Sequence, residues 1–375
     1  MVRLPFTKGL TPPWERFGLR RLSSPPEEAA KTLQVKAFPW RRLGIGLLVV
    51  VGAMLLAGSL GATPIPPFTA VEIVVSKIPG VDISQDWPAS WDTILWKIRF
   101  PRIILAGLVG AALAVSGATY QGLFRNPLAD PYLIGVASGA GLGAIIVLIA
   151  GVTTASAGFG ILPMAAFVGA VIAVSVAYLV ARRSDGLPLT TLILAGVAVS
   201  ALCGAVGSLL MIRSDPDLRP VLTWLLGGFV SAQWRHSVFV LPYLIPGVLL
   251  LLAHGRVLNV MQLDEDRARQ LGVNVERTKL LLIGAASLCT AAAVAFSGLI
   301  GFVGLVAPHV VRLLWGGDHR TLLPMAGLLG AAFLILADLT ARTILSPTEI
   351  PVGIVTAFCG APFFLYLLMR RRAKV

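Results

Sequence analysis

Long apolar stretches, separated by short polar connections, recur along most of this 375-residue chain. A helix needs about 20 apolar residues to cross the roughly 30 Å hydrocarbon core of a bilayer. The pattern therefore predicts an all-α polytopic membrane protein with ten transmembrane helices. The ten predicted segments are 43–62, 102–122, 132–150, 161–181, 189–211, 236–253, 278–297, 304–315, 321–344 and 352–369.

The eighth predicted helix is short, and an apolar stretch with three glycines, Gly298, Gly301 and Gly304, leads into it. This pattern is typical of a broken or re-entrant element. Irregular backbone at membrane depth needs protein or a water-filled cavity around it. We therefore expect this stretch to face the interior of the helix bundle.

The composition agrees with a membrane protein: 56% of the residues are hydrophobic, 13% are charged and the mean hydropathy is +0.84. Soluble domains carry about 25% charged residues. The net charge of +13 does not indicate a nucleic-acid partner, because the basic residues flank apolar segments instead of clustering on a polar domain.

The positions of the basic residues predict the orientation. With ten helices and both termini in the cytoplasm, 23 of the 31 Lys and Arg residues fall on the cytoplasmic side. We expect residues 1–42 to be a cytoplasmic basic leader that is disordered, and residues 43–372 to form the transmembrane domain of a multi-pass plasma-membrane protein.

Two short segments resemble each other. Residues 111–117 and 292–298 share an Ala-rich pattern that ends in Ser-Gly, and Pro127 and Pro308 follow ten residues later. The second and seventh helices would run in opposite directions, so this favours an inverted repeat of helices two to five and seven to ten. Chance similarity between packed helices rich in small residues is the alternative.

Two motifs lie on the predicted cytoplasmic side. Asn126 to Pro131 contains Pro127, Asp130 and Pro131, which would end one helix and start the next. Pro308, His309 and Arg312 lie near the inner end of helix eight. A lone histidine is more often a structural hydrogen-bonding group than a metal ligand, and the four histidines lack metal-ligand spacing, so no metal site is predicted.

The longest cytoplasmic connection, at about 254–277, contains an amphipathic stretch. Acidic residues lead and arginines follow, as the helix dipole favours, and glycine ends the pattern. The sequence predicts a short helix that is either a solvated surface element or a docking element for a cytoplasmic partner. Its residues are Leu263, Asp264, Glu265, Arg267, Ala268, Arg269, Gln270, Leu271 and Gly272.

Asp338 falls within the ninth predicted helix, where an ionisable group is costly and usually faces the interior. Arg342 lies one helical turn away. A structural ion pair between them and a role for Asp338 in transport are both open at this point.

Six motifs, in order from about residue 96 to residue 370, closely resemble the permeases of iron-siderophore, haem and vitamin B12 importers, which are ATP-binding-cassette (ABC) importers of type II. The motifs are Arg99-Phe-Pro-Arg102, Asn126-Pro-Leu-Ala-Asp-Pro131, Ala268-Arg-Gln-Leu-Gly272, the Gly301 to Arg312 stretch, Asp318-His-Arg320 and Glu349-Ile-Pro-Val-Gly353.

The resemblance implies a homodimer that works with two cytoplasmic ATPase subunits, an external binding protein and membrane lipid. This chain would be a transporter subunit and not an enzyme. It would bind no cofactor itself, and ATP and Mg would be used by the partner ATPase. The sequence agrees, since it contains no G-x-x-x-x-G-K-[ST] phosphate loop.

The resemblance also implies roles for individual residues. The stretch from Leu263 to Gly272 would couple to the ATPase, and the fifth and tenth helices of both copies would line the pathway. The binding protein would dock at Arg99, Arg102 and Arg342, and the cytoplasmic gate would consist of Asn126, Leu128, Leu189 and Thr190.

Two other classes of protein compete with this interpretation. An intramembrane protease fits poorly, because no H-E-x-x-H motif is present. An ion-coupled secondary transporter is the stronger rival, since Asp338 and an inverted repeat would suit one. The sequence does not choose among an iron siderophore, haem and cobalamin as the transported compound.

Overall fold

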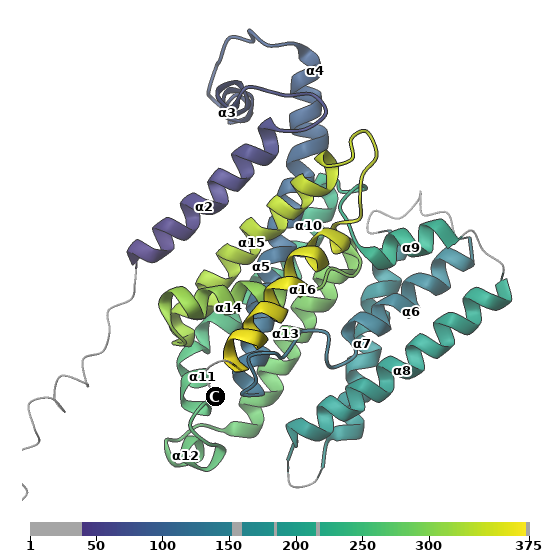
Figure 1. Cartoon of the computed structure of the whole chain (residues 1–375), viewed down its shortest axis with the longest axis vertical. Helices are drawn as coiled ribbons and strands as arrows, with labels where there is room; N and C mark the ends of the chain where they lie inside the picture. The colour runs from purple at the N-terminus through teal and green to yellow at the C-terminus, as the bar shows by residue number, and fades with distance from the viewer. Residues whose placement is uncertain (1–39, 152–159, 184–185, 215–217, 373–375) are drawn as a thin grey trace, which may run out of the picture. The chain divides into compact units, whose positions relative to one another are not determined.

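The computed structural model describes residues 40–151, 160–183, 186–214 and 218–372, and most of these residues are helical. A helix is present at each of the ten predicted segments, which confirms the all-α polytopic fold (Figure 1). These helices are α2 (Trp40–Ser59), α5 (Phe100–Leu123), α6 (Val136–Ile149), α7 (Ile161–Ala181), α8 (Leu189–Ser214), α10 (Trp234–Ala253), α13 (Val275–Ser297), α14 (Val303–Trp315), α15 (His319–Thr343) and α16 (Val352–Arg372).

Within the described ranges, seven candidate spans are long and apolar enough to cross a membrane, and α6, α14 and the apolar part of α16 are shorter. The structure also contains short elements outside the ten segments: α3 (Pro67–Val75), α4 (Ala89–Asp92), the π-helical turn η2 (Thr93–Arg99), α9 (Leu218–Leu226), α11 (Gly255–Met261) and α12 (Glu265–Gln270). Only α12 was predicted, because its charge pattern and final glycine are local signals, whereas the others are too short for a spanning pattern.

Several boundaries differ from the prediction. Helix α2 begins at Trp40, so the helical domain starts before residue 43. The rest of the predicted leader, residues 1–39, lies outside the described residues. The connection predicted at 254–277 is largely helical, because α11 and α12 lie within it and α13 already begins at Val275.

Helices α6 and α14 are short for a related reason. Gly135 precedes α6 with φ +92°, and Phe302 precedes α14 with φ +68°. A left-handed residue cannot continue a right-handed helix, so the helix starts only after it. Helix α6 therefore begins four residues later than predicted. Helices α6 and α14 are the third and eighth predicted helices, so they hold equivalent positions in the two halves of the predicted repeat. This is a second similarity between the two halves. The inverted repeat itself stays a prediction.

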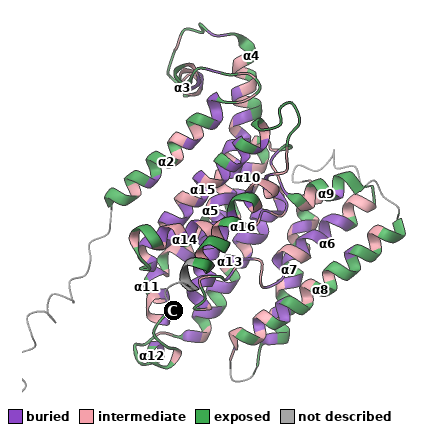
Figure 2. Cartoon of the chain, in the orientation of Figure 1, coloured by how far each residue is buried: buried purple, intermediate pink, exposed green. Residues whose placement is uncertain are grey.

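Helices α5, α13 and α15 form the buried centre of the transmembrane domain, whereas α8 is exposed along much of its length (Figure 2). Glycines let the central helices approach closely. A Cβ atom on Gly110 of α5 would lie 2.3 Å from the carbonyl oxygen of Gly330 in α15. Small residues at such contacts are the usual means of packing helices in a membrane.

The predicted broken element lies between α13 and α14, where Gly298 and Ile300 are buried and the other residues are half-buried. Backbone hydrogen bonds join this element and two other points where the chain is not helical. Gly228, after α9, donates its N–H to the carbonyl of Ser297 at 2.8 Å, and Val352, at the start of α16, donates to the carbonyl of Gly227 at 2.9 Å. These bonds satisfy backbone groups that hydrocarbon could not.

We predict that Gly110→Ala destabilises the fold by about 1–3 kcal/mol, because the added methyl group forces the α5 and α15 backbones apart. Gly284→Ala in α13 is the matched control, since a Cβ there would meet no atom within 4 Å. Thermal unfolding in detergent would measure both. Equal midpoints for the two variants would contradict the close packing of α5 on α15.

Candidate functional site

Helix α12 lies at the end of the domain opposite α3 and α4 (Figure 1). The carboxylate of Asp264 caps it by accepting the first N–H of the helix at 2.8 Å, and Gly272, with φ +83°, follows its end. Ala268 is buried, whereas the leucines that flank the helix, Leu263 and Leu271, are 58% and 64% exposed. The predicted amphipathic helix is confirmed, and it is fixed on one face with apolar side chains free at both ends.

The first segment of the predicted gate connects α5 to α6. The side-chain oxygen of Asn126 accepts the N–H of Leu128 at 2.9 Å, which folds the chain into a turn around Pro127. Leu128 is 45% exposed. Asp130 accepts the N–H two residues on at 2.8 Å, and burial raises the pKa of Asp130 to about 6. Pro131 packs against the start of α14.

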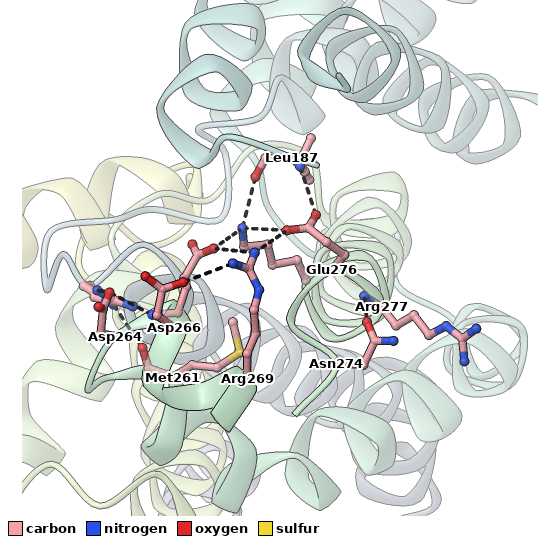
Figure 3. Close-up of polar contacts among 11 residues, drawn as sticks. Leu187, Met261, Asp264, Asp266, Arg269, Asn274, Glu276 and Arg277 are labelled. Carbon is pink, nitrogen blue, oxygen red and sulfur yellow. Dashed lines mark hydrogen bonds and ion pairs between the residues drawn. The ribbon is translucent and has the colours of Figure 1, made fainter. Parts of the chain in front are cut away.

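The second segment of the predicted gate is the start of α8, where Leu189 is half-buried and Thr190 is exposed. Just before this start, both the N–H and the carbonyl of Leu187 form hydrogen bonds to side chains of α13. Its N–H donates to the carboxylate of Glu276 at 2.9 Å, and its carbonyl accepts from the ammonium of Lys279 at 3.2 Å. The first turn of α13 therefore fixes the approach to α8 (Figure 3).

Polar contacts join α12 to residues that lie next to both gate segments. The ammonium of Lys279 lies 2.9 Å from the carboxylate of Glu265 in α12 and 3.3 Å from that of Glu276. On the other side, Arg125, next to the first gate segment, donates to the backbone before α12 at 3.0 Å and lies 3.7 Å from Asp264. Helix α12 is therefore linked, through Arg125 and Lys279, to the residues beside both predicted gate segments.

The motif on α14 forms a separate contact with α5. Arg312 donates to the side-chain oxygen of Gln121, and the amide of Gln121 donates to the carbonyl of Gly304 at 3.1 Å. Pro308 lies within the helix, and His309 is buried edge-on against two phenylalanines of α16. The structure thus places these residues in packing between helices, and no group of metal-ligating side chains occurs among the described residues.

At the opposite end, Asp338 is 1% exposed and forms a buried ion pair. Its two oxygens accept from Nε of Arg102 at 2.8 and 2.9 Å, and a second nitrogen of Arg102 lies 2.8 Å from Glu349. Arg342, the partner one turn along the same helix, is more distant at 3.8 Å. We call Arg102, Asp338, Arg342 and Glu349 the outer charge cluster.

The arginines predicted to receive a binding protein gather at this end, but they do not form the open patch that docking suggests. Arg99 and Arg102 are 5% and 6% exposed. Arg99 donates to backbone carbonyls at and just after the end of α2, and Arg342 donates to another near that end. Their docking role stays a prediction, while a structural role in joining α2, α5 and α15 is evident.

Comparison with protein-family models matches residues 47–370 to the FecCD transport family. This chain belongs to the FecCD transport family. Among solved structures, one described as a metal-chelate type ABC transporter in an inward-facing conformation superposes with a TM-score of 0.76 and 32% identity. The match covers 88% of this chain and 99% of that one.

Similar proteins carry permease names. An ABC transporter permease, YvrB of Bacillus subtilis, is 44% identical over 87% of this chain and 93% of its own length. The cobalamin import permease BtuC of Halobacterium salinarum is 42% identical over 90% and 98%, and the hemin transport permease HmuU of Yersinia pestis is 44% identical over 77% and 88%. As in these FecCD relatives, the chain is a transport component of an ABC importer, and ATP hydrolysis belongs to a separate subunit.

Sequence reasoning missed the residues that connect the predicted FecCD elements. Arg125, Glu276 and Lys279 were counted only for their charge or not singled out, and Leu187 lies just outside the predicted gate. For Lys279, the available signal was a basic residue about one turn into an apolar helix, where a cation needs nearby acceptors. No local pattern indicates that the acceptors come from 14 and 92 residues away.

We predict that Asp338→Asn destabilises the protein by about 3–5 kcal/mol, because it leaves Arg102 buried without its main partner. Glu349→Gln is the control, since the Glu349 side chain is 35% exposed and its loss should matter less. Thermal unfolding in detergent compares them. An Asp338→Asn protein that unfolds like wild type but loses ion-dependent uptake would instead support a transport role for Asp338.

Proposed function

We propose that this FecCD permease imports cobalamin, haem or an iron chelate as a homodimer that works with two cytoplasmic ATPase subunits and an external binding protein. The observation that carries the proposal is the position of α12, which is linked through Arg125 and Lys279 to the residues next to both predicted gate segments. A helix with this attachment is suited to convert motion of an ATPase into opening or closing of a gate.

The exposed side of α12 supports contact with an ATPase. Leu263 and Leu271 flank a row of charged residues and are largely exposed although apolar. Apolar anchors surrounded by polar groups are typical of protein interfaces. ATP and Mg would act in the partner subunit.

The exposed helices support a second copy as partner. Most of α8 is uncovered, and Leu194, Leu202 and Leu209 are each more than 60% exposed, as is Phe358 of α16. Residues 189–210 contain no charged side chain. Two copies that met along α8 and α16 would enclose an apolar pathway. Such a wall holds cargo weakly, which suits release when selectivity resides in an external binding protein.

The outer end supports attraction of that binding protein. Together with Arg99, the outer charge cluster contains three arginines and two carboxylates, so it keeps one net positive charge. Arg99 and Arg102 are buried and already hold partners within this chain, so their charge would act on a binding protein mainly at a distance. We therefore expect this end to steer an acidic partner rather than to bind it tightly.

The ion-coupled alternative is not favoured. Asp338, the residue that suggested it, is held by Arg102 through both oxygens and is closed off from solvent. A carboxylate with this pairing stabilises the helix bundle and is poorly placed to exchange an ion.

Orientation gives one test. We predict that both termini are cytoplasmic, so a cysteine at Asp82, between α3 and α4, lies outside and one at Arg182, after α7, lies inside. With the three native cysteines replaced, a membrane-impermeant maleimide should label Asp82→Cys in intact cells and Arg182→Cys only after permeabilisation. The reverse pattern would overturn the proposed topology.

Uptake gives the second test. The chain, purified with the ATPase and binding protein encoded beside it, is reconstituted in liposomes and offered labelled cobalamin, haem and a ferric siderophore. We expect uptake of one compound that requires both ATP and the binding protein. Uptake driven by an ion gradient, without ATPase, would refute the proposal.

A further inference from the structure

Lys279 is a buried cation at the cytoplasmic end of α13, with only 3% of its side chain exposed. Its ammonium has three acceptors at 2.9, 3.2 and 3.3 Å: the carboxylate of Glu265, the carbonyl of Leu187 and the carboxylate of Glu276. An ammonium group has three N–H donors, so its hydrogen-bonding capacity is filled. A buried cation is tolerated only with such partners.

The three acceptors come from different elements. Glu265 begins α12, Glu276 lies in the first turn of α13 beside Lys279, and Leu187 precedes α8. Because Glu276 also accepts the N–H of Leu187, the segment before α8 is tied to the same turn of α13 by two bonds. Lys279 is therefore the point where α12 meets the approach to Leu189 and Thr190.

The other ionic contacts of α12 are weaker. Arg269, with a side chain 51% exposed, lies 3.8 Å from Glu276, and the Arg125–Asp264 pair is 3.7 Å apart with both side chains well exposed. Solvent screens such pairs. Within the part of the chain that the structure describes, Lys279 forms the ionic contact of α12 that is best shielded from solvent.

We propose that Lys279 is the positioning residue that transmits movement of α12 to the gate segment at the start of α8. The inference rests on the proposed function, in which an ATPase displaces α12. Movement of α12 would carry the carboxylate of Glu265 with it. Either the ammonium follows and pulls on Leu187, or the contact opens and releases Leu187; in both cases the gate segment changes with α12.

The test uses the complete importer in liposomes and measures ATP hydrolysis and cargo uptake in the same samples. Lys279→Met keeps the length and apolar stem of the side chain but removes the charge. We expect ATP hydrolysis to persist and uptake per ATP hydrolysed to fall about tenfold, as loss of a buried charge-assisted bond implies. Lys279→Arg, which keeps the charge, should restore part of this ratio.

Arg182→Met is the matched control, since Arg182 is an exposed cation at the same end of the domain and makes no contact with α12 in the structure. It should leave uptake per ATP unchanged. Should Lys279→Met fail to fold, Glu265→Ala removes the same contact from the α12 side and leaves Lys279 with its other two acceptors; it should lower the ratio in the same direction.

A second readout separates transmission from mere stability. Two spin-label pairs, one between α12 and α15 and one between Thr190 and α15, report whether each element moves when ATP is added. In the wild-type chain both should move, and in Lys279→Met α12 should move without Thr190. A wild-type uptake ratio in Lys279→Met, or movement of both elements, would overturn the inference while leaving the importer intact. No ATP-dependent uptake by wild type would overturn the proposed function and the inference together.

Discussion

Hydrocarbon offers no hydrogen-bonding partner, and this constraint governs the whole domain. Helices satisfy most backbone groups, and where helices stop, other interrupted segments supply the missing partners. The backbone hydrogen bonds that Gly228 and Val352 donate, to the carbonyls of Ser297 and Gly227, are one example. Buried cations follow the same rule, since Arg102 pairs with Asp338, 236 residues away, and Lys279 pairs with Glu265 of α12 as well as with Glu276 of its own helix.

The two ends of the domain use the same arrangement for different purposes. In each, a cation on a well-packed helix holds two carboxylates, at least one of them on another element: Asp338 and Glu349 around Arg102, and Glu265 and Glu276 around Lys279. Around Arg102, Asp338 belongs to α15, which is packed tightly on α5, so the pair joins two tightly packed helices. Around Lys279, Glu265 belongs to a six-residue helix with exposed leucines, so in the proposed function the same chemistry would join a displaced helix to a fixed one.

The sequence was sufficient to predict the ten helices, because an apolar stretch long enough to cross a bilayer is a strong signal. It was also sufficient for α12, since the acidic residues, arginines and final glycine are all local. It was insufficient where a partner lies far along the chain. For Asp338, the sequence offered Arg342, four residues away, as an ion-pair partner and left a transport role open, whereas the closer partner is Arg102, 236 residues away. The late start of α6 depends on the left-handed backbone at Gly135, which a hydropathy pattern does not encode.

Because all three N–H donors of Lys279 have acceptors, few substitutions should be accepted at this contact during evolution. A substitution at Lys279 alone strands Glu265 and Glu276 beside each other, and a substitution at Glu265 alone leaves part of a buried charge unmatched. Accepted changes at these two positions should therefore arrive in pairs, or not at all. Arg182 lies a few residues from the same gate segment but is exposed to solvent. We therefore expect substitutions at Arg182 to be accepted singly.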